Sequence, residues 1–502
     1  MKAFLLHRDQ DFDLQGKPPW NARQLIEDLE LETLFNAMAR RDQLLFDVAK
    51  SVILSSLDTD PDTILYRQHI LKDCLKNPFI VRGLYHLAGR VMESEKKHYW
   101  SFLSDYPSAI LDRSISVLHT LVTALRELRN IANVQADKFE SEGFTTLFST
   151  LKRELSDEYF ATIQNHLKEL KFRNGVLITA ELGQGNKGAN YALRKSQGKG
   201  RGWLEWILSD KLSGFVVRIH PRDEAGAKAL SGLRDRGIHL VANALAQSAD
   251  HIVSFFNMLR TESAFYLGCL NLHEQVSKMG EPVSFPLPIT AGKRRFSCKE
   301  LYDVCLALSM ERKVVGNDVN ADGKRLVIIT GANQGGKSTF LRSAGLAQLM
   351  MQAGMFVPAK SFSANVCYGI FTHYKREEDP AMQSGKLDEE LTRMSEIVDR
   401  LKSDSLLLSN ESFAATNERE GSEIARQIVT ALSEKQIKVF FVTHLYEFAH
   451  GLYKKNIESA LFLRAERQSD GGRTFKLIQG EPLQTSYGED LYNRIFGFRG
   501  DK

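Results

Sequence analysis

One stretch of the sequence decides the fold of the C-terminal half: RLVIITGANQGGKST, residues 325–339. Residues 325–330 are a largely apolar run of the length of a buried strand, and residues 331–339 fit the pattern G-x-x-x-x-G-K-[ST]. Apolar residues at helical spacing follow and end near Gly354. Because strand, glycine-rich loop and helix are the setting that this pattern requires, it predicts a phosphate-binding loop rather than a chance glycine turn.

The residues of this loop have expected roles in binding ATP. Glycines allow successive backbone N–H groups to face a phosphate, and the N-terminus of the following helix adds partial positive charge. We expect Lys337 to reach the β- and γ-phosphates and the Ser338 hydroxyl to bind Mg²⁺. The predicted nucleotide-binding residues are Gly331, Ala332, Asn333, Gln334, Gly335, Gly336, Lys337, Ser338 and Thr339.

A second apolar run, residues 405–409, is followed by Asn410 and Glu411. Glu411 is predicted to orient or deprotonate the attacking water, with an exposed helix-capping carboxylate as the alternative. Asn410 lies where an aspartate usually holds the metal shell. Its amide keeps the shape and can contact metal-bound water, but it lacks the negative charge. We therefore expect Asn410 and Ser338 to bind Mg²⁺, with weaker retention of the ion or slower turnover.

A third run, residues 438–443, ends in His444, and residues 421–432 have the apolar spacing of a crossover helix. A histidine in this position is able to sense a γ-phosphate, and a core or surface histidine is the alternative. We predict Glu411, His444 and Lys337 as the catalytic residues. Strands that alternate with helices indicate an open, mostly parallel sheet with the ligand at the carboxyl ends of the strands.

The N-terminal half has a different pattern. No proline occurs between Pro107 and Pro221, so residues 26–280 are expected to be mostly helical. Residues 238–278 predict one long helix, and two shorter helices broken near Asp250 or Gly268 are the alternative. Three of the twelve prolines fall within residues 282–288, which favours a linker. The predicted domains are a helical domain at residues 1–280, a linker at residues 281–296 and a phosphate-loop domain at residues 297–502.

Residues 174–205 are a basic, glycine-rich insertion in the helical half. Val176, Leu177 and Ile178 form a short β-prone run, and no acidic residue occurs between Glu181 and Glu205. Such a strip is expected to attract a phosphate backbone, and a solvated hairpin is the alternative. The predicted DNA contacts are Lys187, Arg194, Lys195, Lys199 and Arg201, with Tyr191 and Trp203 among them.

Composition sets limits on the class of protein. The chain has 502 residues, of which 43% are hydrophobic and 25% charged, so it has ample material for several globular domains. The net charge of +4 is too small to indicate a nucleic-acid partner by itself. The sequence has no uninterrupted run of 18 apolar residues, so a transmembrane helix is not expected. The N-terminal apolar run is too short for a secretory signal. Five cysteines without a CxxC pair favour a reducing cytoplasm and no zinc site.

The C-terminal region resembles the MutS family of DNA mismatch-repair ATPases. The matching segments are residues 329–346, Asn317-Asp318, residues 354–359, residues 410–421, residues 443–448 and Ser486-Tyr487-Gly488, which together span about residues 315–497. In the helical half, Tyr66-Arg67-Gln68 is similar to the start of the family's core, and residues 238–278 would be its lever helix. The resemblance implies a shortened protein with core, lever and ATPase domains and without the mismatch-recognition domain.

The sequence departs from the family pattern at several positions. Asn410 replaces the aspartate that lies next to the metal in the family. Residues 412–415 replace a family segment that contains glycine and arginine. Leu387-Asp388 follow Ser384-Gly385-Lys386, where the family has a Ser-Thr pair that reaches the ATP of the partner subunit. The chain also contains no Phe-x-Glu tripeptide, which the family uses as a wedge at mismatches.

Two functions are consistent with this sequence. The resemblance implies a homodimeric, ATP-driven clamp on duplex or structured DNA in repair or recombination, with slow ATP hydrolysis. The alternative is a nucleotide-gated scaffold that recruits proteins and hydrolyses little or no ATP, which Asn410 and the altered Ser384–Asp388 region favour. A transporter-type ATPase is disfavoured, because the sequence lacks LSGGQ, the motif of that class.

Overall fold

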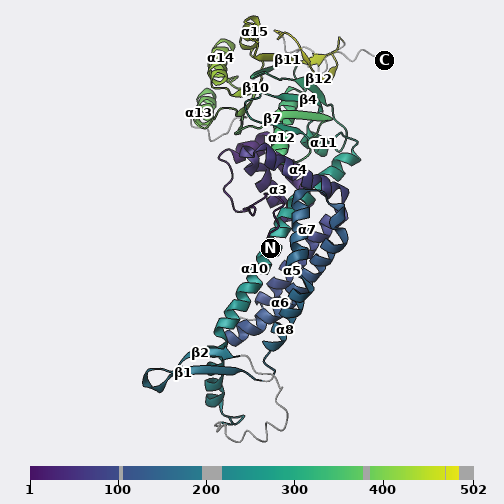
Figure 1. Cartoon of the computed structure of the whole chain (residues 1–502). Helices are drawn as coiled ribbons and strands as arrows, with labels where there is room; N and C mark the ends of the chain where they lie inside the picture. Colours follow the sequence, from purple (N-terminus) through teal and green to yellow (C-terminus); the bar gives the residue numbers. More distant parts are fainter. Residues whose placement is uncertain (101–105, 174, 195–216, 377–384, 470, 485–502) are drawn as a thin grey trace, which may run out of the picture. The chain divides into compact units, whose positions relative to one another are not determined.

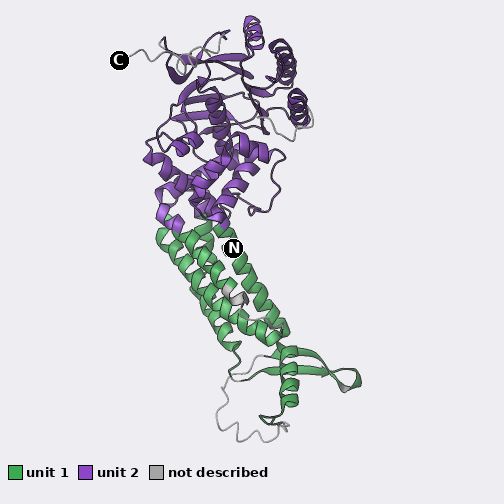
Figure 2. Ribbon diagram, turned by 180° about the vertical axis from the view of Figure 1, so that it is seen from behind, with its two compact units in different colours: residues 1–3, 83–137, 145–260 green, residues 4–82, 138–144, 261–502 purple. Residues whose placement is uncertain are grey.

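The computed structural model describes residues 1–100, 106–173, 175–194, 217–376, 385–469 and 471–484 (Figure 1). The chain divides into two compact units (Figure 2). Unit 1 comprises residues 1–3, 83–137 and 145–260, and unit 2 comprises residues 4–82, 138–144 and 261–502. The predicted domain boundaries at 280 and 297 follow chain order instead, and they stay a prediction.

Unit 1 is a bundle of long helices whose apolar faces pack together. It contains α6 (Pro107–Gln135), α8 (Asp157–Glu169) and most of α5 (Pro78–Trp100), α7 (Glu142–Glu154) and α10 (Glu224–Lys278). Leu118, Leu121, Leu125 and Leu128 of α6 recur at helical spacing and are buried. The predicted long helix is confirmed as a single helix of 55 residues, so the alternative of two shorter helices is wrong.

A small antiparallel hairpin belongs to the same unit. It consists of β1 (Leu177–Leu182), the 3-10 turn η3 (Gln184–Asn186) and β2 (Gly188–Arg194). Gly237 of α10 allows the hairpin to approach the helix, because a Cβ at this position would lie 2.5 Å from the side chain of Ile178. The Arg236 guanidinium also lies 5.6 Å from the centre of the Tyr191 ring. The small β insertion in the helical half is therefore confirmed as far as Arg194.

Unit 2 begins with short helices and their caps. They are α1 (Ala22–Asp28), α2 (Leu31–Ala39), α3 (Gln43–Ser55), the 3-10 turn η1 (Ser56–Asp58) and α4 (Pro61–Lys76). Asp42 and Asp60 accept hydrogen bonds from the first backbone N–H groups of α3 and α4. Leu25, Leu34 and Phe35 are fully buried, as their helical spacing predicts.

The main sheet of unit 2 has six strands in the order β12-β11-β6-β10-β9-β8. These strands are β6 (Leu326–Gly331), β8 (Ile370–Tyr374), β9 (Leu406–Asn410), β10 (Lys438–Val442), β11 (Ala460–Arg467) and β12 (Arg473–Gln479). All neighbouring pairs are parallel except β11 with β12, which are antiparallel. The predicted α/β fold with a mostly parallel sheet is therefore confirmed.

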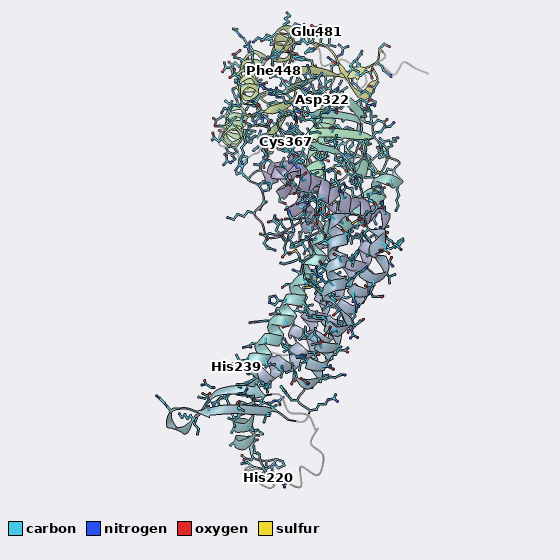
Figure 3. All side chains as sticks on the ribbon, in the orientation of Figure 1. His220, His239, Asp322, Cys367, Phe448 and Glu481 are labelled. Carbon is cyan, nitrogen blue, oxygen red and sulfur yellow. The ribbon has the colours of Figure 1, made fainter. Side chains whose placement is uncertain are left out.

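Helices cover this sheet, and their apolar side chains pack against it to form the core. They are α12 (Lys337–Gln352), α13 (Lys386–Val398), α14 (Glu418–Glu434) and α15 (Tyr446–Lys454). Phe448 of α15, labelled in Figure 3, packs with its ring centre 5.1 Å from that of Phe441 on β10. Gly345 lets α12 lie close to β9, because a Cβ there would be 2.6 Å from a methyl group of Leu408.

A second, four-stranded sheet has the order β3-β7-β4-β5. It contains β3 (Leu287–Ile289), β4 (Phe296–Leu301), β5 (Asn317–Asn320) and β7 (Ser361–Asn365), and the short helix α11 (Val304–Met310) follows β4. Part of the stretch predicted as a linker is therefore an edge strand of this sheet. Pro288 fits there because an edge strand can lack one backbone donor.

Two buried glutamines hold the C-terminal end of α12. The Gln352 side-chain amide donates to the carbonyl oxygens of Ser56, Leu57 and Cys367, and its oxygen accepts from the Cys367 N–H. The Gln348 amide donates to Gln352 and to the Asn365 carbonyl. The end of the helix is thus bonded to the backbone of η1 and of the segment after β7.

Candidate functional site

The predicted phosphate-binding loop lies between β6 and α12, at the carboxyl edge of the six-stranded sheet. Three residues of the loop have positive φ: Gly331 (105°), Gln334 (56°) and Gly336 (87°). Phe340 begins the regular hydrogen bonding of the helix by donating to Gly336. An α-helix leaves its first N–H groups without helical partners, so this end of α12 presents donors and partial positive charge.

The loop fits a phosphate group because it is packed where only glycine has room. A Cβ on Gly331 would lie 2.8 Å from the backbone nitrogen of Ala465 in β11, and a Cβ on Gly335 would lie 2.6 Å from the Ala465 Cβ. The positive φ of Gly331 adds a second reason for glycine. The main chain of the loop therefore packs closely against β11 and forms a narrow cradle, which is the shape that the loop motif requires.

Lys337 lies inside this cradle. Its side chain is 5% exposed, and its ammonium group donates to the carbonyl oxygens of Gly331 at 2.9 Å and Ala332 at 3.0 Å. Burial lowers the pKa of Lys337 to about 8, while the carboxylate of Glu411 acts in the opposite direction. These two acceptors of the buried cation are neutral carbonyl oxygens, so an anion would stabilise it and the site fits a triphosphate.

Ser338 and Asn410 meet at the same edge. The Ser338 hydroxyl donates to the Asn410 side-chain oxygen at 2.9 Å, which joins the start of α12 to the end of β9. Hydroxyl and amide oxygens are suitable ligands for a hard cation such as Mg²⁺. The chemistry of this pair therefore fits the predicted metal position, although both ligands are neutral.

Glu411 and His444 form the second polar pair. His444 Nε2 lies 2.9 Å from Glu411 Oε1, and both side chains are partly buried. The hydrogen bond from His444 lowers the pKa of Glu411, and the charges of Lys337 and Lys375 act in the same direction against the effect of burial. Glu411 is therefore a carboxylate at neutral pH, held at the ends of β9 and β10.

A pocket of about 440 Å³ adjoins the loop. Its apolar walls include Met310, Val315, Phe340 and Phe475, while Gln334 and Thr339 of the loop line the side next to the phosphate cradle. A flat apolar ring with a few polar groups fits such a space. The pocket is therefore suited to the base and sugar of a nucleotide whose phosphates lie in the loop.

Sequence reasoning missed the residues that bring β12 to the loop. The Arg473 guanidinium donates to the carbonyl oxygen of Asn333 at 3.2 Å, and Phe475 lies against Gly336. Asn317 fixes this strand, because its amide donates to the Phe475 carbonyl and accepts from the Leu477 N–H. Asn317 stood out only through the family resemblance, and no sequence signal marks Arg473 or Phe475.

Two of the predicted DNA contacts lie on the β1–β2 hairpin of unit 1. Lys187 and Arg194 are exposed on β2 and the turn before it, and Arg194 donates to the Thr179 hydroxyl at 3.0 Å. Lys195, Lys199 and Arg201 lie outside the described residues, as do Trp203, Ser384 and Ser486-Tyr487-Gly488. The structure thus describes two of the five predicted contacts.

No helix among the described residues has both the length and the apolar character needed to cross a bilayer. The five cysteines Cys74, Cys269, Cys298, Cys305 and Cys367 are buried and carry free thiols.

Comparison with known families matches two parts of the chain. Residues 59–279 match the MutS2 N-terminal domain, and residues 327–494 match MutS domain V. A mismatch-recognition domain is not among these matches. The chain is also 35% identical over 248 residues to the DNA mismatch repair protein MutS of Clostridium kluyveri, which covers 48% of this chain and 28% of that protein.

A second relative is MutS protein homolog 4 of Mus musculus, with 31% identity over 189 residues, 36% of this chain and 20% of the relative. The DNA mismatch repair protein MutS of Acetivibrio thermocellus is 27% identical over 247 residues, again 48% of this chain and 28% of the relative. The chain therefore matches less than a third of the length of these relatives.

The fold and the loop define a nucleotide-binding domain of the phosphate-loop class. The chain belongs to the MutS family, with a MutS2-type N-terminal domain followed by MutS domain V, an ABC-like ATPase domain. It is thus a MutS-family ATPase related to proteins of DNA mismatch repair.

Proposed function

We propose that this protein is an ATP-dependent DNA-binding protein in which ATP binding and hydrolysis operate a dimeric clamp on duplex or structured DNA. The observation that carries the ATPase part is the meeting of two polar pairs, Ser338–Asn410 and Glu411–His444, at the strand ends beside the loop that holds Lys337. Such an arrangement supplies groups for a triphosphate, a metal ion and a water in one place.

Each residue has a role in this proposal. The backbone of residues 331–339 and the Lys337 ammonium bind the phosphates, and Ser338 and Asn410 hold Mg²⁺, which when bound neutralises phosphate charge. Glu411 orients the attacking water. Because its pKa is lowered, it is a weak base, and its main contribution is position rather than early removal of a proton. His444 holds Glu411 and senses the γ-phosphate. We expect turnover to be slow.

The DNA part of the proposal rests on the family and on local charge. The relatives include proteins named for DNA mismatch repair. Lys187 and Arg194, with Lys195, Lys199 and Arg201 next in sequence, would contact the phosphate backbone. In this proposal the helical domain of residues 1–280 grips DNA, the ATPase domain of residues 297–502 dimerises, and α10 transmits closure. Such coupling requires that ATP binds the open and closed states with different affinity.

A second function is favoured by one observation. Asn410 faces Ser338 as a neutral amide, so the metal position lacks the charge of an aspartate. A protein that binds ATP and hydrolyses little or none of it would then act as a nucleotide-gated scaffold for other proteins. In either function we place the protein in the cytoplasm, because its five buried cysteines carry free thiols.

Steady-state ATP hydrolysis separates the two functions. We expect slow turnover by the wild-type protein that is lost in Glu411→Gln and kept in the matched control Glu447→Gln, which changes an exposed carboxylate on α15. Tight ATP binding without turnover supports the scaffold. Wild-type turnover in Glu411→Gln would remove Glu411 from the mechanism.

Binding competition tests the DNA part. Matched duplex, mismatched duplex, branched DNA and single strands should be compared with and without ATP. We expect duplex or branched DNA to bind with an affinity that ATP changes. Equal binding of all four DNAs, unaffected by ATP, would contradict the clamp.

A further inference from the structure

A buried polar cluster lies directly behind Glu411, and it contains none of the residues predicted from the sequence. His373 of β8 is fully buried, and its Nδ1 lies 2.6 Å from the Ser412 hydroxyl oxygen. Its Nε2 lies 3.0 Å from the carbonyl oxygen of Glu390 on α13. The hydroxyl of Ser409 on β9 lies 2.5 Å from that of Ser412. The residue after Glu411 is thus bonded to two strands and, through the imidazole, to a helix.

The directions of these hydrogen bonds follow from the partners. A carbonyl oxygen only accepts, so His373 Nε2 carries the hydrogen and donates to Glu390. Burial lowers the pKa of His373 to about 4, so the ring is neutral and Nδ1 accepts from the Ser412 hydroxyl. Ser409 then donates to the Ser412 oxygen. The Ser412 hydroxyl also lies 2.9 Å from the carbonyl oxygen of His373. Its single proton serves one acceptor fully, and the neutral ring needs that proton at Nδ1.

Phe413 is held by the same groups. Its ring stacks on His373 with centres 5.5 Å apart, and its backbone N–H donates to the Glu390 carboxyl group. Its carbonyl oxygen approaches Gly421 of α14 so closely that a Cβ there would lie 2.4 Å away. The segment after Glu411 is therefore fixed by β8, α13 and α14 together.

This fixing matters because the segment is strained. Glu411 and Phe413 both have left-handed backbone, with φ of 55° and 63°, a conformation that is unfavourable for a residue with a side chain. Surrounding contacts must hold such a conformation. A buried polar network is also a costly way to fill space, since apolar side chains of similar volume pack without needing partners.

We propose that His373 and Ser412 are positioning residues for ATP hydrolysis, which hold the loop of residues 411–413 so that the Glu411 carboxylate points to the attacking water. The proposal rests on the proposed ATPase function. His373 itself does not touch the nucleotide. Its loss should therefore lower the rate of hydrolysis while leaving the affinity for ATP unchanged.

The test compares four variants. Ser412→Ala removes the hydroxyl, and His373→Phe keeps an aromatic ring against Phe413 but removes both hydrogen bonds. His373→Asn keeps an oxygen acceptor near the position of Nδ1. The matched control is Ser405→Ala, another fully buried serine, at the opposite end of β9. For each variant kcat, KM and the Kd for a non-hydrolysable ATP analogue are measured.

We expect His373→Phe and Ser412→Ala to lower kcat by about tenfold to 10²-fold, as a displacement of a catalytic group by about 1 Å does. The Kd should stay within about twofold of wild type, which also shows that the variants are folded. His373→Asn should recover part of kcat, and Ser405→Ala should match the wild type.

Two outcomes overturn the proposal. If His373→Phe and Ser412→Ala bind the analogue and hydrolyse ATP like the wild type, the cluster does not position Glu411. If kcat and Kd change together, and His373→Asn is no better than His373→Phe, the cluster has a structural role only. Absence of hydrolysis by the wild type would instead reject the proposed ATPase function, so the two failures are distinguishable.

Discussion

The phosphate-binding loop of unit 2 and the β1–β2 hairpin of unit 1 both carry the positive charge expected to meet phosphates, but they hold it differently. Lys337 is buried and bonded to two carbonyl oxygens of its own loop. Lys187 and Arg194 are exposed, and five of the six residues of β1 are exposed as well. A buried cation in a preformed cradle selects the geometry of one ligand, whereas exposed charges attract any phosphate backbone and depend on salt.

The sharpest test of this contrast is Lys337→Ala. Removing one member of a buried charge pair typically costs about 2–5 kcal/mol, so ATP should bind roughly 30-fold more weakly or worse, and ATP-dependent changes in dimerisation or DNA binding should disappear. Isothermal titration and sedimentation with and without ATP measure both. An unchanged ATP response would mean that the loop is not the nucleotide site.

Removing positive charge from the hairpin segment should weaken DNA binding in part rather than abolish it. Neutralising Arg194, Lys195, Lys199 and Arg201 together should weaken DNA binding and lower the slope of log K against log salt by roughly three to four, at about 0.9 per phosphate contact. Fluorescence anisotropy over a range of salt concentrations measures this. ATP binding should not change in this variant, and a wild-type salt slope would remove the hairpin from the DNA surface.

Asn410→Asp tests whether the neutral metal ligand limits the site. A charged ligand should strengthen Mg²⁺ binding by roughly three- to tenfold, because a charge-assisted contact is worth about 1 kcal/mol more than a neutral one. The Mg²⁺ concentration that gives half-maximal ATP hydrolysis measures it. Asn410→Ala, which lacks a side-chain oxygen, should shift this concentration in the opposite direction. Equal values for all three proteins would exclude residue 410 as a metal ligand.

The smallest effect concerns protons. With its pKa lowered to about 8, Lys337 is half neutral at pH 8 without nucleotide, and bound phosphate raises that pKa. ATP binding should therefore take up about half a proton at pH 8 and close to none at pH 6.5. Titrations of ATP in buffers with different ionisation enthalpies measure this uptake. The hairpin variant, which keeps Lys337, should take up the same amount, and no uptake at pH 8 by the wild type would contradict the prediction.

Sequence reasoning succeeded where a local pattern and the tertiary fold agree. Strand β6, the loop and α12 follow one another along the chain, so residues 325–339 alone predicted this strand–loop–helix unit. The contact of Glu411 with His444 was not predicted, but it follows from the rule that neighbouring parallel strands end at one edge.

The remainder depends on contacts that no local pattern carries. His373 reaches Ser412 because β8 lies beside β9, with His373 opposite Ser409 in the register. The prolines near β3 favoured a linker, yet Pro288 sits on a sheet edge where its missing donor costs little. The start of α10 was missed because Gly226, Gly232 and Gly237 lower helix propensity, which the rest of the helix overcomes.

The two glutamines at the end of α12 have a mechanical consequence. Sliding or turning this helix about its axis would break the bonds of Gln352 to Ser56, Leu57 and Cys367, and each buried polar group left unpaired costs about 1–3 kcal/mol. Because the C-terminal end of α12 is hydrogen-bonded to the backbone of η1, we expect a displacement of α12 at the phosphate-binding loop to move η1 with it.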